Sequence, residues 1–313
     1  MDYTTLGRSG LRVSIAGLGC GGHSRLGTAT GNSEQESIAV VRQALDLGIT
    51  LIDTAEAYGT EAIVGKALRD VRRDQVVIAT KKLLPADDHP DPAGAFRRGL
   101  EHSLRRLGTD HVDIYFLHGV RPEQYRFAHE VLVPVLTSMR EQGKLRCIGI
   151  TEAFSRDPGH QTLQQAVRAD CWDVMMVGFS LLNQSARSRV FPHTQARNIG
   201  VLGMFAVRTA LSQTARLKAV LTELKGSNQL AAEVAEAADP LGFLTQSGKA
   251  ASLPEAAYRY CRHEPGIDVV LTGTGKLEHL QANVAALLKP PLIEEDVQRL
   301  SDLFGRVDSV SGN

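Results

Sequence analysis

Four side chains able to move a proton stand near the ends of three strand-like runs in this sequence. Asp53 closes the run ITLID, and Tyr58 follows it five positions later. The run VVIAT leads into Lys81, and the run VDIYFL leads into His118. A carboxylate, a phenol, an amine and an imidazole are groups that acid–base catalysis uses. They would meet if the strands are parallel neighbours, because the parallel strands of a barrel end at one rim.

These four groups suit the reduction of a carbonyl by a bound hydride donor. Negative charge grows on the carbonyl oxygen, and a proton must be delivered there. Tyr58 is the candidate acid, and a nearby ammonium such as Lys81 would lower its pKa from about 10. Asp53 would hold that ammonium in place, and His118 would hydrogen-bond the same oxygen. Taken singly, the four could also cap a helix, pack, face solvent or end a strand.

The elements that would position these residues alternate along the chain. Short β-rich runs, several of them continuously apolar as in strands buried on both faces, are separated by segments with helical spacing. One helix is predicted to begin after Ser33, and two others to end at Gly108 and Gly143. The predicted strands span residues 12–19, 49–53, 76–80, 112–117, 146–151, 173–179, 199–205 and 268–273.

Eight repeated strand–helix units in a chain of 313 residues predict an α/β fold, a closed (β/α)8 TIM barrel with parallel strands. No low-complexity or Pro/Gly/Ser-rich linker divides the sequence, so we expect one domain over residues 1–313. The segment 206–250, after the seventh strand, is too long for an ordinary loop and contains helical patterns. It is either a substrate lid or a packing or oligomer contact.

Composition argues against several classes of partner. Thirty-five basic and thirty-five acidic residues give zero net charge, which offers no electrostatic attraction to nucleic acid or an anionic membrane. No apolar run is long enough to span a bilayer, and the N-terminus resembles no secretory signal. Four scattered cysteines without a CxxC pair suggest a reducing compartment and a cytoplasmic location. The ten histidines show no metal-ligand spacing, so we expect no metal site.

Two glycine-containing motifs lack the flanking residues that a nucleotide-binding site requires. GLGCGG at 17–22 matches GxGxxG after a strand, but it leads into a loop, whereas a Rossmann site must lead directly into a helix. GTEAIVGK at 59–66 has one residue too many before its Gly-Lys for a P-loop, and Ala67 stands where Ser or Thr is required. The sequence therefore predicts neither a Rossmann dinucleotide site nor a nucleoside triphosphatase.

As a set, the motifs resemble the aldo-keto reductase superfamily over nearly the whole chain. The opening YTTLGRSGLRVSIAGLGCGG resembles that family's N-terminal β-hairpin and first strand, and IDTAEAYGTEAIVGKAL resembles its Asp-to-Tyr signature. VVIATKK, VDIYFLHG, GIT and DVVLTGTGKLEHLQANVAAL align in the same order. The resemblance implies a catalytic tetrad of Asp53, Tyr58, Lys81 and His118, with Tyr58 as the general acid. It also implies NAD(P)H bound across the barrel rim without a Rossmann fold.

The resemblance further implies which residues hold the cofactor. Gly21 and Gly22 would lie beside it, and Phe179 would replace a tyrosine that stacks on the nicotinamide. Lys276 and His279 could contact a 2′-phosphate, which favours NADP, although NAD is also compatible. The full implied set is Gly21, Gly22, Asp53, Thr151, Glu152, Met176, Phe179, Gly273, Thr274, Gly275, Lys276, His279 and Asn283.

Four further positions depart from the family pattern. Thr151 and Glu152 replace the Ser-Asn pair that commonly holds the carboxamide, and Met176 replaces a frequent glutamine. Gly119 stands where some branches have a tryptophan in the wall of the substrate pocket. These substitutions change the groups offered to the nicotinamide and to the substrate.

We therefore expect an NAD(P)H-dependent oxidoreductase that interconverts a small aldehyde or ketone, or a sugar-like carbonyl, with its alcohol. A cofactor-sensing or regulatory barrel with little turnover is one alternative, because of the changed nicotinamide positions. A lyase that forms a Schiff base on Lys81 is another. Arg208, just past the seventh strand, could bind a carboxylate or phosphate or simply face solvent. The sequence predicts neither the particular substrate nor the oligomeric state.

Overall fold

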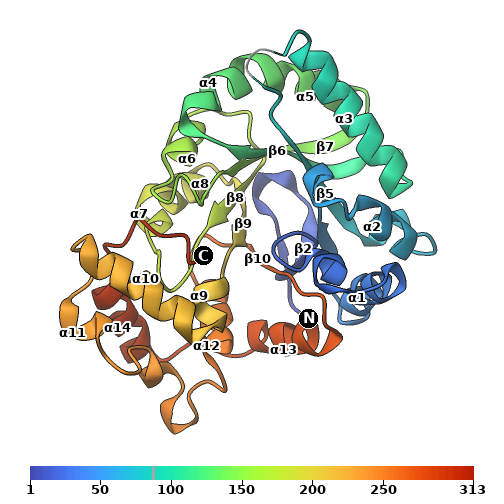
Figure 1. Ribbon diagram of the computed structural model, residues 1–313. Helices are drawn as coiled ribbons and strands as arrows, with labels where there is room; N and C mark the ends of the chain where they lie inside the picture. The colour runs from blue at the N-terminus through green and yellow to red at the C-terminus, as the bar shows by residue number, and fades with distance from the viewer. Residues whose placement is uncertain (87–88) are drawn as a thin grey trace.

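A closed barrel of eight parallel strands forms the centre of the protein (Figure 1). The computed structural model describes residues 1–86 and 89–313. Around the barrel the strands follow the order β10-β3-β4-β5-β6-β7-β8-β9, and each neighbouring pair is parallel. The strands are β3 (Ala16–Gly19), β4 (Leu51–Asp53), β5 (Val77–Leu83), β6 (Val112–Val120), β7 (Leu145–Glu152), β8 (Val174–Gly178), β9 (Gly200–Met204) and β10 (Val269–Thr272). The predicted (β/α)8 TIM barrel is confirmed.

The prediction of one strand over residues 12–19 is wrong, because this run forms two strands. β1 (Tyr3–Thr5) and β2 (Arg12–Ser14) make an antiparallel N-terminal hairpin, and only β3 belongs to the barrel. The chain changes direction between β2 and β3, where the Ser14 hydroxyl donates to the carbonyl of Ala16 over 2.6 Å. The apolar pattern hid this break because residues on both sides of it are buried.

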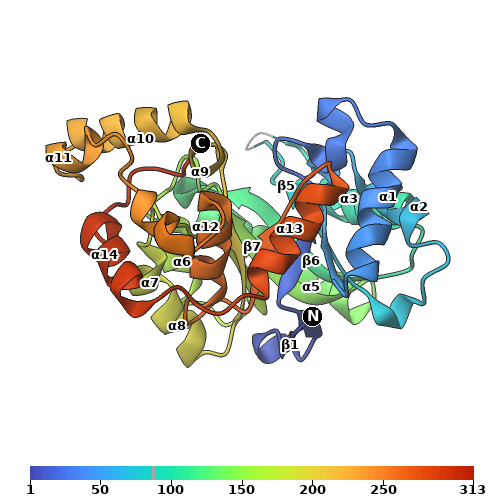
Figure 2. The same ribbon diagram turned by 90° about the horizontal axis from the view of Figure 1, so that it is seen from below.

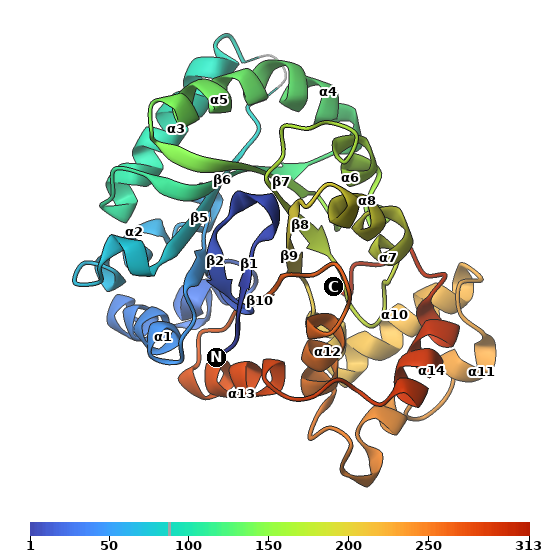
Figure 3. The same ribbon diagram turned by 180° about the vertical axis from the view of Figure 1, so that it is seen from behind.

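The hairpin closes one end of the barrel and lies in front of the strands in Figure 3. Leu6, Leu11 and Val13 are buried there in one cluster with residues of the barrel interior, among them Leu51 and Val77. These two residues lie early in their strands, so the hairpin covers the amino ends. The rim formed by the carboxyl ends of the strands is left for ligands, as is usual for this barrel.

The predicted helix start at Ser33 and the predicted helix end at Gly108 are confirmed. α1 (Glu34–Asp46) begins after Ser33, whose side chain accepts from the backbone N–H of Glu36 in a capping box. α3 (Pro92–Leu107) ends at Gly108, whose φ of 69° is in the left-handed region that glycine tolerates. The other helices around the barrel are α2 (Glu61–Ala67), α4 (Tyr125–Phe127), α5 (Val133–Glu141), α6 (Gln161–Ala166), α7 (Ala186–Arg189), α8 (Phe191–Ala196), α12 (Leu253–Arg262) and α13 (Leu277–Leu287).

The segment 206–250 carries helices of its own, as predicted. It contains α9 (Thr209–Ser212), α10 (Thr214–Gly226) and α11 (Ala232–Ala235), followed by the 3-10 turns η7 (Gly242–Leu244) and η8 (Gln246–Gly248). Figure 2 shows α10 and α11 near the C terminus, at the end of the barrel opposite to the hairpin. The insertion therefore lies on the side where the strands end.

One further helix, α14 (Glu294–Phe304), follows the barrel and was not predicted. Leu300 and Phe304 are buried on it within the larger hydrophobic cluster. Across residues 1–86 and 89–313, no helix is long and apolar enough to cross a membrane. The expectation of a single domain over residues 1–313 stays a prediction.

Candidate active site

Lys81 and Asp53 form a buried ion pair near the carboxyl ends of two adjacent strands. Asp53 ends β4 and pairs in register with Ala79 of β5, the strand that carries Lys81. The Lys81 ammonium lies 2.7 Å from each carboxylate oxygen of Asp53 and also donates to the carbonyl of Thr54 over 2.8 Å. Lys81 is fully buried, and Asp53 is 3% exposed. Three oxygen atoms thus fix the position of the ammonium.

Tyr58 lies against this pair. It ends the 3-10 turn η3 (Glu56–Tyr58), shortly after β4, and the centroid of its ring is 4.8 Å from Lys81 Nζ. Its hydroxyl is 3.4 Å from His118 Nε2 of β6, and the two rings meet edge to face. Gly21 leaves room for the phenol ring, because a Cβ at that position would lie 2.4 Å from Tyr58 Cε2. The structure thus brings the four predicted proton-handling residues together.

Burial and neighbouring charges together set the protonation of these groups. Burial raises the pKa of Tyr58, and the Lys81 ammonium opposes that change without reversing it. Lys81 therefore acts in the expected direction, although the Tyr58 pKa lies above its usual value because of burial. Burial and, to a lesser extent, Lys81 lower the pKa of His118 to about 3, so His118 is neutral near pH 7. Burial would lower the pKa of Lys81, but Asp53 and Tyr58 raise it above its usual value.

A small polar network behind the ion pair escaped the sequence reasoning. The hydroxyls of Thr54 and Thr60 lie 2.9 Å apart, and Thr60 donates to the carbonyl of Cys20 over 3.2 Å. Cys20 in turn donates its backbone N–H to the carbonyl of Asp53. These contacts join the ends of β3 and β4 beneath Tyr58. Two of these three contacts use backbone carbonyls, which leave no pattern in the sequence beyond the strand ends themselves.

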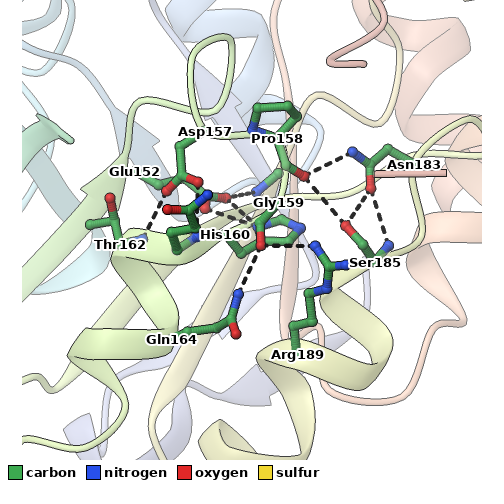
Figure 4. Close-up of polar contacts among 12 residues, drawn as sticks. Glu152, Asp157, Pro158, Gly159, His160, Thr162, Gln164, Asn183, Ser185 and Arg189 are labelled. Carbon is green, nitrogen blue, oxygen red and sulfur yellow. Dashed lines mark hydrogen bonds and ion pairs between the residues drawn. The ribbon is translucent and has the colours of Figure 1, made fainter. Parts of the chain in front are cut away.

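The next strands around the rim use their polar side chains differently. Glu152, the last residue of β7, is 3% exposed, and each of its carboxylate oxygens lies 2.9 Å from His160 Nδ1 (Figure 4). The backbone N–H of Gly178 donates to the same carboxylate over 2.8 Å. Thr151 Oγ1 accepts from the backbone N–H of Gly119. Burial raises the pKa of Glu152, and His160 opposes that increase.

His160 belongs to a loop that side chains hold in shape. Its φ of 61° lies in the left-handed region, which residues other than glycine seldom adopt. The Asp157 carboxylate accepts from the backbone N–H groups of Gln161 and Thr162, each over 2.8 Å (Figure 4). This places the imidazole over Glu152. No spacing in the sequence indicated His160, because the contact depends on a loop conformation.

Met176 and Phe179 are also turned into the protein. Met176, in β8, is 3% exposed and belongs to the cluster that fills the barrel interior. The Phe179 ring is 1% exposed; it stacks on Tyr260 with centroids 5.8 Å apart and contacts Phe191 at 5.4 Å. The structure therefore does not bring Phe179 to the open rim. Its stacking on a nicotinamide stays a prediction, and so do the cofactor contacts of Thr151, Glu152 and Met176.

The segment predicted to surround the adenosine runs from the end of β10 into α13, and comprises Gly273, Thr274, Gly275, Lys276, His279 and Asn283. Gly275 packs on the loop after β3, since a Cβ there would lie 2.4 Å from Gly27 Cα. Lys276 and His279 are exposed, as is Gly22 beyond the end of β3. Exposed basic side chains at the start of a helix can bind a phosphate. In the part of the chain that is described, no three His, Cys, Asp or Glu side chains are grouped to hold a metal.

Comparisons with known proteins identify the family and the fold of this chain. The model of the Aldo/keto reductase family matches residues 17–304. Aldo-keto reductase YhdN of Bacillus subtilis is 30% identical over 300 residues, which cover 90% of this chain and 87% of YhdN. L-galactose dehydrogenase of Arabidopsis thaliana is 26% identical, with coverage of 99% and 95%. The solved holo form of aldo-keto reductase AKR11C1 from Bacillus halodurans shares the fold, with a TM-score of 0.74 at 24% identity over 98% of this chain and 97% of that one.

Proposed function

The chain belongs to the aldo/keto reductase family of NAD(P)-dependent carbonyl oxidoreductases, and from that premise we propose that Tyr58 is its general acid and base. The substrate is a small aldehyde or ketone, including sugar-like carbonyls, and the product is the alcohol. One observation carries the proposal: a buried ammonium, Lys81, is fixed by Asp53 against the ring of Tyr58, whose hydroxyl faces His118.

The residues of the chain divide the work of moving the proton. When bound, the nicotinamide cofactor supplies the hydride for reduction or accepts it in oxidation. The raised pKa of Tyr58 keeps its phenol protonated at neutral pH, so it can donate to the carbonyl oxygen as negative charge grows there. Neutral His118 can hydrogen-bond that oxygen and orient the carbonyl. Lys81 stabilises the phenolate that remains, and Asp53 keeps the ammonium in position.

We infer NADP rather than NAD as the preferred cofactor. Lys276 and His279 are exposed on the segment predicted to meet the adenosine, and a cationic pair there suits a 2′-phosphate. Gly21 and Gly22 would then lie along the cofactor beside Tyr58. A cytoplasmic location is supported by the four free cysteines, three of them buried.

The regulatory alternative rests on a specific observation. The Glu152 carboxylate is buried against His160 and Gly178, and the Phe179 ring is covered by Tyr260 and Phe191. Two positions that would hold a nicotinamide are therefore already occupied, which suits a barrel that binds cofactor with little turnover. The Schiff-base lyase finds no comparable support, because Asp53 and Tyr58 hold the pKa of Lys81 above its usual value despite its burial, and the ammonium is not nucleophilic.

The proposal is tested by binding and turnover on one set of variants. Calorimetric titration with NADPH and NADH identifies the tighter cofactor, which is then used with a panel of aldehydes and ketones. Tyr58→Phe should lower kcat by about 100- to 10,000-fold while the Kd of the cofactor is retained. Tyr115→Phe is the matched control, since it removes a buried phenol hydroxyl from the outer side of β6.

Near-normal turnover in Tyr58→Phe would overturn the role of Tyr58. Tight binding of cofactor by the unaltered protein, combined with no turnover of any carbonyl in the panel, would favour the regulatory barrel. Loss of turnover in Tyr115→Phe as well would mean that the phenol substitutions act through the fold.

A further inference from the structure

Residues 56–61 and 80–82 lie side by side at the carboxyl end of β5. The first stretch carries Tyr58 and the second carries Lys81, whose ammonium lies 4.8 Å from the centroid of the Tyr58 ring. Lys81 is turned into the barrel like Ala79 of the interior cluster, because alternate residues of a strand share a face. Its two neighbours on the strand are therefore turned to the outer side, where α2 and α3 lie (Figure 1). The two stretches are joined a second time on that side.

The first outer contact is made by a residue that precedes Tyr58. The Glu56 carboxylate accepts from Lys82 Nζ over 2.5 Å, and its other oxygen lies 3.8 Å from the guanidinium of Arg106 in α3. Gly99 of α3 makes room for the lysine stem, because a Cβ there would lie 2.2 Å from Lys82 Cδ. The Glu56 side chain is 30% exposed. This pair ties the start of η3 to β5 at a half-buried position.

The second outer contact is made by a residue that follows Tyr58. Glu61 begins α2 and is 1% exposed. One of its carboxylate oxygens accepts from the Thr80 hydroxyl over 2.5 Å, and the other accepts from Arg106 Nε over 2.7 Å. A carboxylate that is buried so deeply is costly unless it is paired and hydrogen-bonded. Glu61 meets both conditions only while α2, α3 and β5 keep this arrangement.

Arg106 joins the two contacts into one network. Its guanidinium lies 2.6 Å from the Glu61 carboxylate and 3.8 Å from that of Glu56. With Lys82, the network holds two cations and two carboxylates, so its charges balance. A network whose charges are already paired offers little to a ligand. Its contacts instead connect both ends of residues 56–61 to β5.

The turn that carries Tyr58 has little rigidity of its own. η3 is a 3-10 turn of three residues, and such turns have poorer hydrogen-bond geometry than α-helices. Gly59 follows it with a φ of 74°, and glycine has the most backbone freedom of all residues. The Thr60 hydroxyl holds the stretch toward β3. The side toward β5 is fixed by Glu56 and Glu61.

The distance between Tyr58 and Lys81 matters for the proton donor. The ammonium favours the phenolate and so opposes the rise in the pKa of Tyr58 that burial causes. An electrostatic effect of this kind weakens as the two groups move apart. The titratable groups that face or influence Tyr58 are Lys81 of β5, Asp53 of β4, Cys20 after β3, His118 of β6 and Arg208 after β9. Glu56 and Glu61 make their contacts on the other side of the wall, so we expect them to act through the position of Tyr58 rather than through their charge.

We propose that Glu56 and Glu61 are positioning residues for Tyr58. Their bonds to β5, on the outer side of the barrel wall, form a clamp that keeps the phenol at a fixed distance from Lys81. This inference rests on the proposed function, because the clamp matters for turnover only if Tyr58 donates the proton. It also gives a reason for the deeply buried Glu61 carboxylate, since buried ionic groups can serve to fix one arrangement of a structure rather than to stabilise it.

The first experiment opens the clamp at its more exposed end. Glu56→Ala should lower kcat by about 10-fold, because a small misplacement of a catalytic group is costly. The KM of the carbonyl, the Kd of NADPH and the urea midpoint should stay close to those of the unaltered protein, since the lost ion pair is partly exposed. Glu56→Gln keeps an oxygen that can accept from Lys82, so it should lose less of kcat than Glu56→Ala does.

Glu101→Ala is the matched control. Glu101 of α3 pairs with Lys144 over 2.8 Å, beside the amino end of β7 and away from residues 56–61. Its substitution removes a carboxylate from a lysine partner, as Glu56→Ala does, and should leave kcat unchanged. A near-normal kcat in Glu56→Ala, or an equal loss in Glu101→Ala, would overturn the proposal.

A second variant opens the other end of the clamp without removing a buried charge. Thr80→Val keeps the size of the side chain and removes only the hydroxyl that donates to Glu61. Combined with Glu56→Ala, it should lower kcat by more than the product of the two single losses, because either contact alone still restrains the turn. Single losses that simply multiply would mean that the two contacts do not act as one clamp.

A spectroscopic measurement separates this inference from the proposed function. The ring resonances of Tyr58 in isotope-labelled protein, identified by their absence in Tyr58→Phe, report its place against Lys81 and the edge of His118. They should shift in Glu56→Ala and stay unchanged in Glu101→Ala, with no substrate added. Such a shift supports the clamp even if the protein turns over no carbonyl. Unmoved resonances in Glu56→Ala would contradict it even if Tyr58 proves to be the general acid.

Discussion

Two halves of the barrel rim each contain a buried pair of titratable side chains, but the two pairs have different roles. On β4 and β5, Lys81 and Asp53 meet with side chains no more than 4% exposed, and the half-buried Tyr58 lies against them. On β7, the Glu152 carboxylate meets His160, and both side chains are fully buried. The first pair faces a group that can meet a substrate. The second faces only backbone and aromatic rings of the protein.

The comparison teaches that a polar residue at a strand end is not by itself a ligand contact. Its role depends on the groups that it contacts. Lys81 contacts the partly exposed phenol of Tyr58, whereas Glu152 contacts the covered ring of His160 and the N–H of Gly178. We therefore assign the β4–β6 half to proton transfer and the Glu152 contacts to holding the loop that carries His160.

Breaking the first pair should produce the largest effect. Lys81→Met leaves the Asp53 carboxylate buried and unpaired, so the free energy of unfolding should fall by about 3–5 kcal/mol and turnover should be lost. Urea unfolding and carbonyl reduction measure the two effects. Lys82→Met is the matched control, because Lys82 forms a more exposed pair with Glu56, and its loss should cost less than about 1 kcal/mol.

The double variant Asp53→Asn/Lys81→Met distinguishes pairing from packing. Because both charges are removed together, much of the stability lost in Lys81→Met should return, while turnover stays low. If the double variant is as unstable as the single one, the burial of the lysine stem rather than the ion pair is what the fold requires.

Breaking the second pair should cost less stability and should act through the loops. Glu152→Ala leaves the N–H group of Gly178 without its acceptor and removes the partner of His160 Nδ1, for a loss of about 1–3 kcal/mol. The exposed Glu123 provides the control, since Glu123→Ala should change stability by less than about 0.5 kcal/mol. If Glu152→Ala left stability unchanged but weakened cofactor binding tenfold, the sequence-based cofactor role of Glu152 would be the better account.

The charge of Glu152 should also appear in the pH dependence of stability. Because burial raises its pKa, the folded protein keeps this proton at pH values where the unfolded chain, with a pKa of 4.5, has released it. The stability that the proton contributes is lost as pH rises from 4.5 through the raised folded value. Relative to Glu152→Gln, the unaltered protein should therefore become less stable over that window. A parallel pH dependence of the two proteins would contradict the raised pKa.

The sequence predicted the first half of the rim well and the second half poorly, for a physical reason. Asp53, Lys81 and His118 lie near the ends of adjacent parallel strands, so strand register alone brings them together. The contacts of Glu152 depend instead on the left-handed φ of His160, and the burial of Phe179 depends on helices far along the chain. Side-chain contacts made by loops and distant helices carry no periodic signal.

The adenosine segment should show a smaller effect, because its cations are exposed. Lys276→Ala should raise the Kd of NADPH by about 3- to 10-fold and leave that of NADH nearly unchanged, since only NADPH carries the 2′-phosphate. Lys218→Ala, which removes a cation from α10, should change neither value. Equal weakening of both cofactors would place Lys276 at a group that they share.

The smallest expected effect is that of pH on kcat/KM, because neither His118 nor Tyr58 should titrate near neutral pH. The pKa of His118 is lowered to about 3, so less than one-tenth of it is protonated above pH 4. The pKa of Tyr58 is raised, so the phenol that donates the proton persists into the alkaline range. Together these shifts predict that kcat/KM for reduction changes by less than about twofold between pH 5 and 8. An inflection near pH 6.5 that disappears in His118→Gln would show that His118 titrates normally. The contrast between His118, which stays neutral over this range, and the titrating Glu152 would then fail.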